Sequence, residues 1–227
     1  MAWTPNGKTY KNSTSKYLKN AVEESLKRLA IDYIDIYYLH WTDGITPIEE
    51  SIDALVTLKK EGKIHSIGVS NLNIDELNKL QKKDIGAIQL KGNLLETNEI
   101  YKHKPYASKL KASLILFSTL ADGLLTDKFN VSTKFDDEDH RNKYPLFEKN
   151  KFLECLDKIK LIKNLIKDYD ATIPQVSLRW LLETEGVDAI LFGSISSKNI
   201  KENLKCLDIN FDDELYKYLK ELIPLNP

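Results

Sequence analysis

One stretch decides how this chain folds: Asp32-Tyr33-Ile34-Asp35-Ile36-Tyr37-Tyr38-Leu39-His40-Trp41. Branched and aromatic side chains dominate it, as is typical of a packed β-strand. The stretch predicts a buried strand over residues 34–39, with His40 just past its end. In parallel α/β proteins the carboxyl ends of strands carry the chemistry, so His40 is a candidate catalytic residue. A lone histidine at a strand end is also commonly a structural hydrogen-bonding group, and the stretch by itself leaves this alternative open.

Helix and strand patterns alternate along the whole chain. Apolar residues at helical spacing predict helices, and short apolar runs predict strands. Helices are expected at 15–29, 47–60, 75–80, 101–110, 151–168, 174–181, 197–204 and 212–222, and strands at 34–39, 64–69, 87–90, 114–118 and 187–192. Ser15 is the expected cap of the first helix, and Gly62 is the expected breaker after the second. Pro5-Asn6-Gly7 predicts a turn, and residues 126–150 predict a long polar loop.

Short apolar strands that alternate with helices are typical of a parallel sheet, because such strands bury both faces. Two architectures fit this pattern, an open doubly wound sheet and a (β/α) barrel. Five strands are expected in the 227 residues, whereas a closed barrel needs eight in about 250 residues. No glycine-rich dinucleotide fingerprint follows any strand, which argues against a Rossmann domain.

Composition narrows the class of protein. The net charge of −1 gives no reason to expect nucleic acid or an anionic membrane as partner. No apolar run approaches the length of a membrane span, and no signal peptide follows Met1, so a cytoplasmic protein is expected. Cys155 and Cys206 are expected to be free thiols. The acidic run at 136–139 is expected to be solvated, and His140 beside it fits no ligand spacing, so no metal site is predicted.

Polar residues end or follow each of the five predicted strands. Because the carboxyl ends of the strands of a barrel converge on one face, these residues are expected to lie near one another. Any single group has a structural explanation, since Ser-Asn after a strand is often only a helix cap. All five together favour the barrel; they are His40-Trp41-Thr42-Asp43, Ser70-Asn71, Gln89, Phe117-Ser118-Thr119-Leu120 and Gly193-Ser194.

A series of longer motifs resembles the aldo-keto reductase family, in order and over nearly the whole chain. The motifs are VEESLKRL at 22–29, DYID at 32–35, LHW at 39–41, LKKEGKI at 58–64, IGVSN at 67–71, FSTLADGLLT at 117–126 and the segment from Gly193-Ser194 to Glu202-Asn203. The resemblance implies an α/β fold of the TIM-type (β/α)8 barrel. It implies that residues 1–227 form a single partial barrel domain, with the last five strands present and the first three missing.

The same resemblance implies an oxidoreductase that reduces aldehydes or ketones to alcohols with NADP(H). In the family, hydride moves from the nicotinamide to the carbonyl carbon and a tyrosine, tuned by a lysine and an aspartate, protonates the oxygen. A histidine orients the carbonyl, and His40 matches it. An imidazole N–H at the oxygen would stabilise the charge that develops in the transition state.

The resemblance also assigns the cofactor-binding residues. Ser70, Asn71 and Gln89 match the residues that bind the nicotinamide carboxamide, and Phe117 matches the ring that stacks on the nicotinamide. The loop over the pyrophosphate corresponds to Ser118, Thr119, Leu120, Ala121, Asp122 and Lys128. The segment around the adenosine phosphate and adenine corresponds to Gly193, Ser194, Ile195, Ser196, Asn199, Glu202 and Asn203. This segment opens a predicted helix, whose free N–H groups suit a phosphate. Arg141 is a further candidate for a phosphate.

Some positions depart from the family pattern. Gly92 stands where a tyrosine is usual, and Ile195 and Asn199 stand where the family often has residues that bind the 2′-phosphate, so NAD(H) is not excluded. No residue matches the catalytic aspartate, tyrosine or lysine, which in the family precede the region that matches Trp3. We therefore expect weak activity or none from this chain alone. The alternative is a non-catalytic NADP-binding or regulatory remnant. Coding sequence upstream of Met1 would separate the two.

Overall fold

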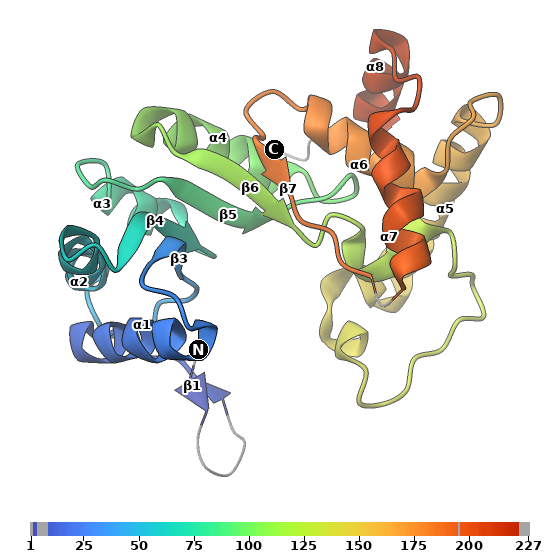
Figure 1. Ribbon diagram of the computed structural model, residues 1–227. Coiled ribbons are helices and arrows are strands. Elements are labelled where there is room, and N and C mark those ends of the chain that lie inside the picture. The colour runs from blue at the N-terminus through green and yellow to red at the C-terminus, as the bar shows by residue number, and fades with distance from the viewer. Residues whose placement is uncertain (1, 4–8, 195, 223–227) are drawn as a thin grey trace. The chain divides into compact units, whose positions relative to one another are not determined.

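The structure, a computed structural model, describes residues 2–3, 9–194 and 196–222. It divides into two compact units, each with its own core (Figure 1). Unit 1 comprises Met1–Leu90 and Ile100–Ile115, and unit 2 comprises Lys91–Glu99 and Leu116–Pro227. The turn predicted at Pro5-Asn6-Gly7 and the cofactor-site prediction for Ile195 lie outside the described residues.

Parallel strands and their crossover helices build unit 1. A short antiparallel hairpin of β1 (Ala2–Trp3) and β2 (Thr9–Tyr10), which the sequence does not predict, precedes them. The elements that follow are α1 (Ser15–Leu29), β3 (Ile34–Leu39), α2 (Ile48–Lys60), β4 (Ile64–Ser70), α3 (Ile74–Lys79), β5 (Ala87–Lys91), α4 (Asn98–Leu110) and β6 (Ser113–Phe117). β4 pairs in parallel with both β3 and β5. The parallel α/β fold expected from the sequence is therefore confirmed.

Unit 2 is mainly helical and contains the last strand of the sheet. Its elements are the 3-10 helices η1 (Ala121–Thr126), η2 (His140–Lys143) and η3 (Pro145–Phe147), then α5 (Lys149–Leu165), α6 (Ile173–Glu183), β7 (Ala189–Ile190), α7 (Ser197–Leu204), η4 (Lys205–Leu207) and α8 (Asp213–Leu222). The strands of the sheet are hydrogen-bonded in the order β3-β4-β5-β6-β7. β5 and β6 each begin in unit 1 and end in unit 2.

Local hydrogen bonds explain where the helices begin and end. α1 is capped by Thr14, whose hydroxyl accepts from the Tyr17 N–H at 3.4 Å, so the prediction of Ser15 as the cap is wrong by one residue. The predicted role of Gly62 is confirmed, because it follows α2 with φ +74°, a conformation that glycine adopts without cost. α6 begins with a capping box in which Thr172 and Gln175 exchange side-chain and backbone hydrogen bonds.

Part of the core of unit 1 lies between α2 and β4. Ile52 and Leu55 of α2 and Ile64 and Val69 of β4 have no exposed surface. In unit 2, Cys155 and Cys206 are buried free thiols as predicted, and burial raises the pKa of both. Burying one aliphatic side chain such as Ile52 or Leu55 contributes about 1.5–3 kcal/mol to folding.

β3 is less buried than its sequence predicts. Tyr33 and Ile36 are 45% and 39% exposed, and in β3 only Leu39 belongs to the core. The reason is position, since β3 lies at the end of the strand order and pairs with β4 alone among the described strands. Tyr33 stacks instead on His65 of β4, with ring centroids 3.9 Å apart.

The strand predicted at 187–192 shortens to the two residues of β7. The Val187 N–H donates to the Thr184 carbonyl in the turn that ends α6, so Val187 cannot join the sheet. On the other side, Leu191 donates to the Leu116 carbonyl, after which the chain leaves the strand.

The segment predicted as a polar loop at 126–150 has a packed interior. Phe129, Phe135, Phe147 and Phe152 form a cluster with ring centroids 5.2 to 6.5 Å apart. The Arg141 guanidinium lies 4.5 Å from the Phe135 ring centroid. The acidic run is therefore only partly solvated, because Asp139 accepts from Arg141 while the residues before it are exposed.

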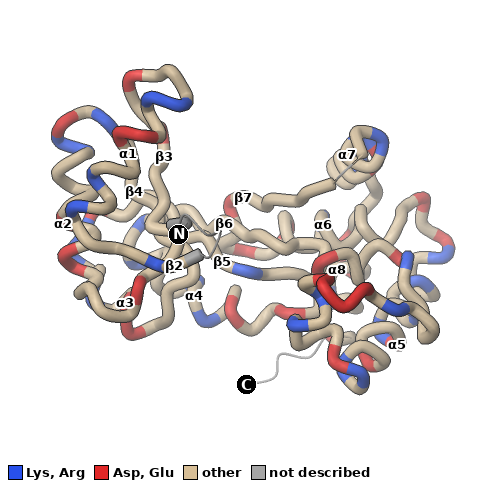
Figure 2. The backbone as a smooth tube through the Cα atoms, turned by 90° about the horizontal axis from the view of Figure 1, so that it is seen from below, with Lys and Arg blue, Asp and Glu red and all other residues tan. Residues whose placement is uncertain are grey.

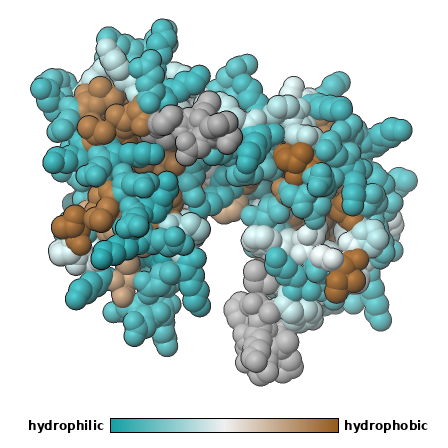
Figure 3. Space-filling model, turned by 180° about the vertical axis from the view of Figure 1, so that it is seen from behind, coloured by the Kyte–Doolittle hydropathy of each residue, from teal (hydrophilic) through white to brown (hydrophobic). Residues whose placement is uncertain are grey.

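Charged and apolar side chains are distributed over both units. Basic and acidic residues are interspersed along the backbone (Figure 2). On the face seen in Figure 3, apolar side chains gather in small separate patches within a mainly hydrophilic surface. Within the ranges that the structure describes, no helix is both long enough and apolar enough to cross a membrane.

Asp43 ties the loop after β3 to the start of α1. Its carboxylate accepts four hydrogen bonds, from the Ser13 N–H at 2.9 Å, the Thr46 N–H at 2.7 Å, the Ile45 N–H at 3.0 Å and the Thr46 hydroxyl at 2.8 Å. Ser13 reciprocates, since its hydroxyl accepts from the Asp43 N–H. Burial alone would raise the pKa of Asp43, but these donors hold it well below its usual value.

We predict that Asp43→Asn lowers the free energy of unfolding by about 1–2 kcal/mol at pH 7, because an amide nitrogen cannot accept from Ser13 and Thr46. A carboxylate with a depressed folded pKa stabilises above its unfolded pKa of about 4 and loses this contribution as the pH falls further. The difference between parent and variant in urea titrations should therefore shrink below pH 4. Asp84→Asn, which alters an exposed pair with Lys59, is the control and should change stability by less than about 1 kcal/mol. An unchanged Asp43→Asn protein would contradict the assignment.

Candidate cofactor-binding site

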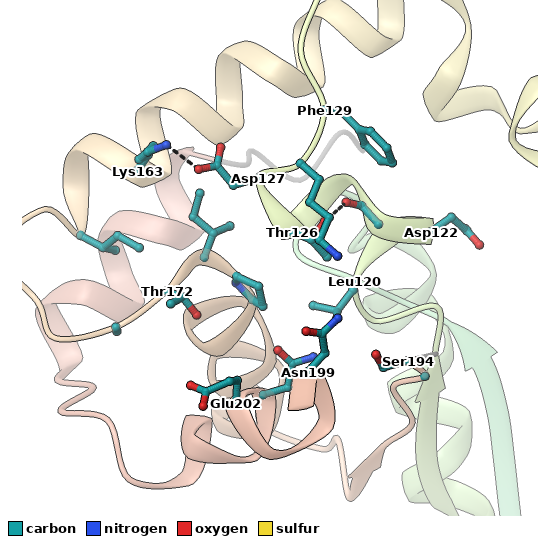
Figure 4. Close-up of a pocket in the computed structure, with 18 of the residues that line it drawn as sticks. Leu120, Asp122, Thr126, Asp127, Phe129, Lys163, Thr172, Ser194, Asn199 and Glu202 are labelled. Atoms are coloured by element: carbon teal, nitrogen blue, oxygen red, sulfur yellow. Dashed lines mark hydrogen bonds and ion pairs between the residues drawn. The ribbon is translucent and has the colours of Figure 1, made fainter. Parts of the chain in front are cut away.

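Unit 2 contains a pocket of about 890 Å³ (Figure 4). Its walls come from the η1 turn, the C-terminal end of α5, the N-terminal end of α6, and α7 with the residues that precede it. A volume of this size suits a large organic ligand. The sequence-predicted residues that line it are Leu120, Asp122, Lys128, Gly193, Ser194, Asn199, Glu202 and Asn203, and the candidate Arg141 lines it too. The segments predicted to hold the pyrophosphate and the adenosine phosphate thus meet at one pocket, although more than sixty residues separate them along the chain.

Other predicted residues of unit 2 stand behind the pocket wall. Phe117, Ser118, Thr119, Ala121 and Ser196 do not line it. The Ser118 hydroxyl donates to the Asp122 carboxylate at 2.9 Å, and the Thr119 hydroxyl donates to the Leu191 carbonyl at 2.9 Å. Ala121 has no exposed surface. Among these side chains, that of Ser118 therefore holds a residue, Asp122, that does line the pocket.

Most charges around the pocket are neutralised by a protein partner. The Arg141 guanidinium donates twice to Asp139 and the Arg141 backbone N–H donates once, and these bonds hold the pKa of that carboxyl well below its usual value. Lys163 pairs with Asp127 at 2.5 Å across the pocket wall (Figure 4). Lys128 is exposed, and the described residues offer it no hydrogen bond or ion pair. Lys128 is therefore the cation best able to meet an anionic ligand.

The sequence does not predict the wall supplied by α5 and α6. Lys163, Ile166 and Lys167 at the end of α5 and Thr172 and Pro174 at the start of α6 all line the pocket. One signal for part of this wall is present in the sequence. Thr172 and Gln175 have the spacing of a capping box, and this pattern predicts a helix start at the residues that line the pocket.

A second group of predicted residues lies in unit 1, at the carboxyl ends of β3, β4 and β5. The Asn71 amide donates to the His40 carbonyl and to the Ser70 hydroxyl, each at 3.0 Å. The Asn71 N–H donates to the Gln89 carbonyl at 3.3 Å, and Ser70 lies opposite Gln89 in the parallel register. Parallel pairing therefore brings together four residues: His40, which the resemblance assigns to the carbonyl group of the substrate, and Ser70, Asn71 and Gln89, which it assigns to the nicotinamide.

His40 is exposed, and its backbone is anchored by Asn71. Partial burial of the ring lowers its pKa from the usual value. The imidazole is therefore mostly neutral at pH 7, with one nitrogen as donor and the other as acceptor. A neutral ring of this kind can donate a hydrogen bond to a carbonyl oxygen.

Comparisons with known proteins agree on one family. The family model described as "Aldo/keto reductase family" matches residues 4–224. Aldo-keto reductase YhdN of Bacillus subtilis is 35% identical over 191 residues, which cover 83% of this chain and 58% of that protein. NADH-specific methylglyoxal reductase of Escherichia coli is 31% identical over 217 residues, 94% of this chain and 66% of that protein. The chain thus spans 58% and 66% of the lengths of these two relatives.

The fold comparison points the same way. The structure of a glycerol dehydrogenase from Gluconobacter oxydans superimposes with a TM-score of 0.90 and 29% identity, over 100% of this chain and 71% of that one. The family match, the relatives and the structural likeness all cover nearly the whole chain, and this chain belongs to the aldo/keto reductase family.

Proposed function

We propose that the pocket of unit 2 binds a nicotinamide cofactor, NADP(H) in the first instance. The observation that carries the proposal is the meeting of residues 120–128 and 193–203 at a single pocket. Lys128 would face a phosphate, and the polar side chains of Asn199, Glu202 and Asn203 would face the adenosine end. NAD(H) remains the alternative, because one relative is named as NADH-specific.

The reaction that this site supports best is reduction of a small aldehyde or ketone to an alcohol. The cofactor supplies the hydride when it is bound. Ser70, Asn71 and Gln89 would hold the carboxamide end of the cofactor, since their donors and acceptors lie at neighbouring strand ends. His40 would donate a hydrogen bond to the carbonyl oxygen and stabilise its developing charge.

The barrel is part of the same proposal. The sheet β3-β4-β5-β6-β7 would correspond to the last five strands of a (β/α)8 barrel, within a single partial barrel domain of residues 1–227. The order of the motifs and the likeness to a longer dehydrogenase chain support this correspondence. None of the tyrosines in this chain matches the proton donor of the family. Full activity would therefore need a proton-donating group that these residues do not supply.

We predict that the purified chain oxidises NADPH slowly or not at all with 4-nitrobenzaldehyde. The expected deficit against a full-length aldo-keto reductase that turns over this aldehyde with NADPH is about 10²–10⁴-fold, the usual contribution of general acid catalysis. Turnover equal to that of the full-length reductase would contradict the prediction. A titration with NADPH, monitored by quenching of protein fluorescence, distinguishes a reductase from a non-catalytic cofactor-binding protein. Binding without turnover favours a cofactor-binding or regulatory role, and no binding at high NADPH refutes the proposed pocket.

We predict that Lys128→Ala weakens NADPH binding about three- to tenfold at low salt, because an exposed cation contributes modestly to binding an anion. The loss should diminish as ionic strength rises. Calorimetric titration of parent and variant with NADPH measures it, and NADH titrations show whether the 2′-phosphate is involved. Lys82→Ala, which removes an exposed lysine of unit 1, is the matched control and should bind like the parent. Equal affinities for all three proteins would count against Lys128.

A further inference from the structure

The turn that follows β6 has an unusual backbone. Ser118, Ala121 and Asp122 have φ values of 53°, 51° and 50°, and Gly123 has φ 99°. Left-handed conformations are disfavoured for residues with a Cβ atom, and three within five residues need strong support from their surroundings. Strain of this kind is found mainly at functional sites. Leu120, Asp122 and Gly123 of this turn line the pocket.

Asn93 supports the turn at its first residue. Its side chain has no exposed surface. The amide nitrogen donates to the Ser118 carbonyl at 3.3 Å and to the Glu96 carboxylate at 3.0 Å, while its oxygen accepts from the Leu95 N–H at 3.0 Å. Both amide hydrogens are thus used. The Ser118 carbonyl also accepts from the Ala121 N–H at 2.9 Å, which closes the turn.

Asn93 is itself held in place from two sides. Glu96 accepts from Lys91 at 2.8 Å, and the Lys91 ammonium lies 3.6 Å from the Tyr144 ring centroid. The backbones of Asn93 and Glu96 form a two-residue bridge with each other. The neighbouring Gly92 N–H donates to the Phe117 carbonyl at 3.1 Å. Residues 91–96 are therefore held together by several contacts and are hydrogen-bonded to the end of β6.

Asp122 links Ser118 to the pocket, because it contacts Ser118 and lines the pocket wall. The Ser118 hydroxyl donates to one oxygen of the Asp122 carboxylate at 2.9 Å, so the orientation of Ser118 sets that of Asp122. His140 lies 3.4 Å from the other oxygen. Asp122 is labelled at the wall of the pocket in Figure 4. A shift of Ser118 would thus move a residue that faces the ligand.

We propose that Asn93 is a positioning residue for the cofactor, because it holds the Ser118 carbonyl and so fixes the strained turn 118–123 that forms the pocket wall. The proposal rests on the proposed function, since it assumes that the pocket binds NADP(H) or NAD(H). Asn93 itself does not line the pocket. Its effect is on the affinity of the pocket, through backbone geometry.

The test compares two variants. Asn93→Asp has nearly the same shape, but its carboxylate would face the Ser118 carbonyl and Glu96 as a third acceptor. We expect a lower melting temperature and a dissociation constant for NADPH about tenfold above that of the parent, the loss of about one hydrogen bond to a buried carbonyl. Adding Glu96→Gln provides an amide that can donate to the new carboxylate. The double variant should recover at least half of the lost melting temperature, yet bind NADPH as weakly as the single variant, because the Ser118 carbonyl still has no donor from residue 93.

Each outcome decides the matter. If NADPH affinity returns together with the melting temperature, Asn93 has only a structural role and the proposal is wrong. It is equally wrong if Asn93→Asp binds NADPH like the parent. If the carboxylate prevents folding, Asn93→Ala removes the amide donors without adding a charge and should give the same tenfold loss. Asn142→Asp, at an exposed amide that donates to the Asp136 carbonyl, is the control and should bind normally. Failure of the parent to bind either NADPH or NADH overturns the proposed function instead.

Discussion

Parallel pairing of strands is the constraint on which the candidate site depends. In a parallel sheet all carboxyl ends lie at one edge. Residues that follow different strands therefore become neighbours in space, although they are far apart along the chain. The register of β4 and β5 places Ser70 opposite Gln89. Asn71 then adopts a left-handed conformation, with φ 58°, and joins the ends of β3, β4 and β5 through its amide and its backbone. The chemistry proposed for His40 depends on this anchoring, because the hydrogen bond from Asn71 fixes the His40 backbone at the end of β3.

Much of this could be predicted from the sequence because its signals are local. Helical spacing predicted the helices to within a few residues, since an amphipathic stripe identifies a helix before its neighbours are known. The local apolar pattern does not predict the exposure of β3, because a strand at the end of the order has the same apolar residues as a central one. β7 is also shorter than the apolar run at 187–192 predicts. Val187 has the side chain of a strand former, but its N–H is taken by the turn that ends α6.

Part of the candidate site could likewise be predicted from the sequence, and part could not. Its strand-end residues and phosphate-loop residues follow recognisable motifs, and the structure brings most of them together within each unit. The wall from α5 and α6 has no such motif, because it depends on how helices pack. Asn93 is a third case. Its importance lies in a hydrogen bond to a backbone carbonyl whose conformation is strained, and neither the strain nor the bond has a signature in the residue types.

The exposed half of β3 has a consequence for how the protein behaves in concentrated solution. A strand at the end of a sheet presents unpaired N–H and C=O groups, which invite pairing with a strand of another molecule. In β3 the apolar Ile36 lies beside Asp35, and Asp32 precedes the strand; both carboxylates are exposed. Two such strands brought together in antiparallel or parallel register would place like charges close to one another. The two aspartates therefore place like charge at this edge of the sheet, and the resulting repulsion discourages pairing between molecules.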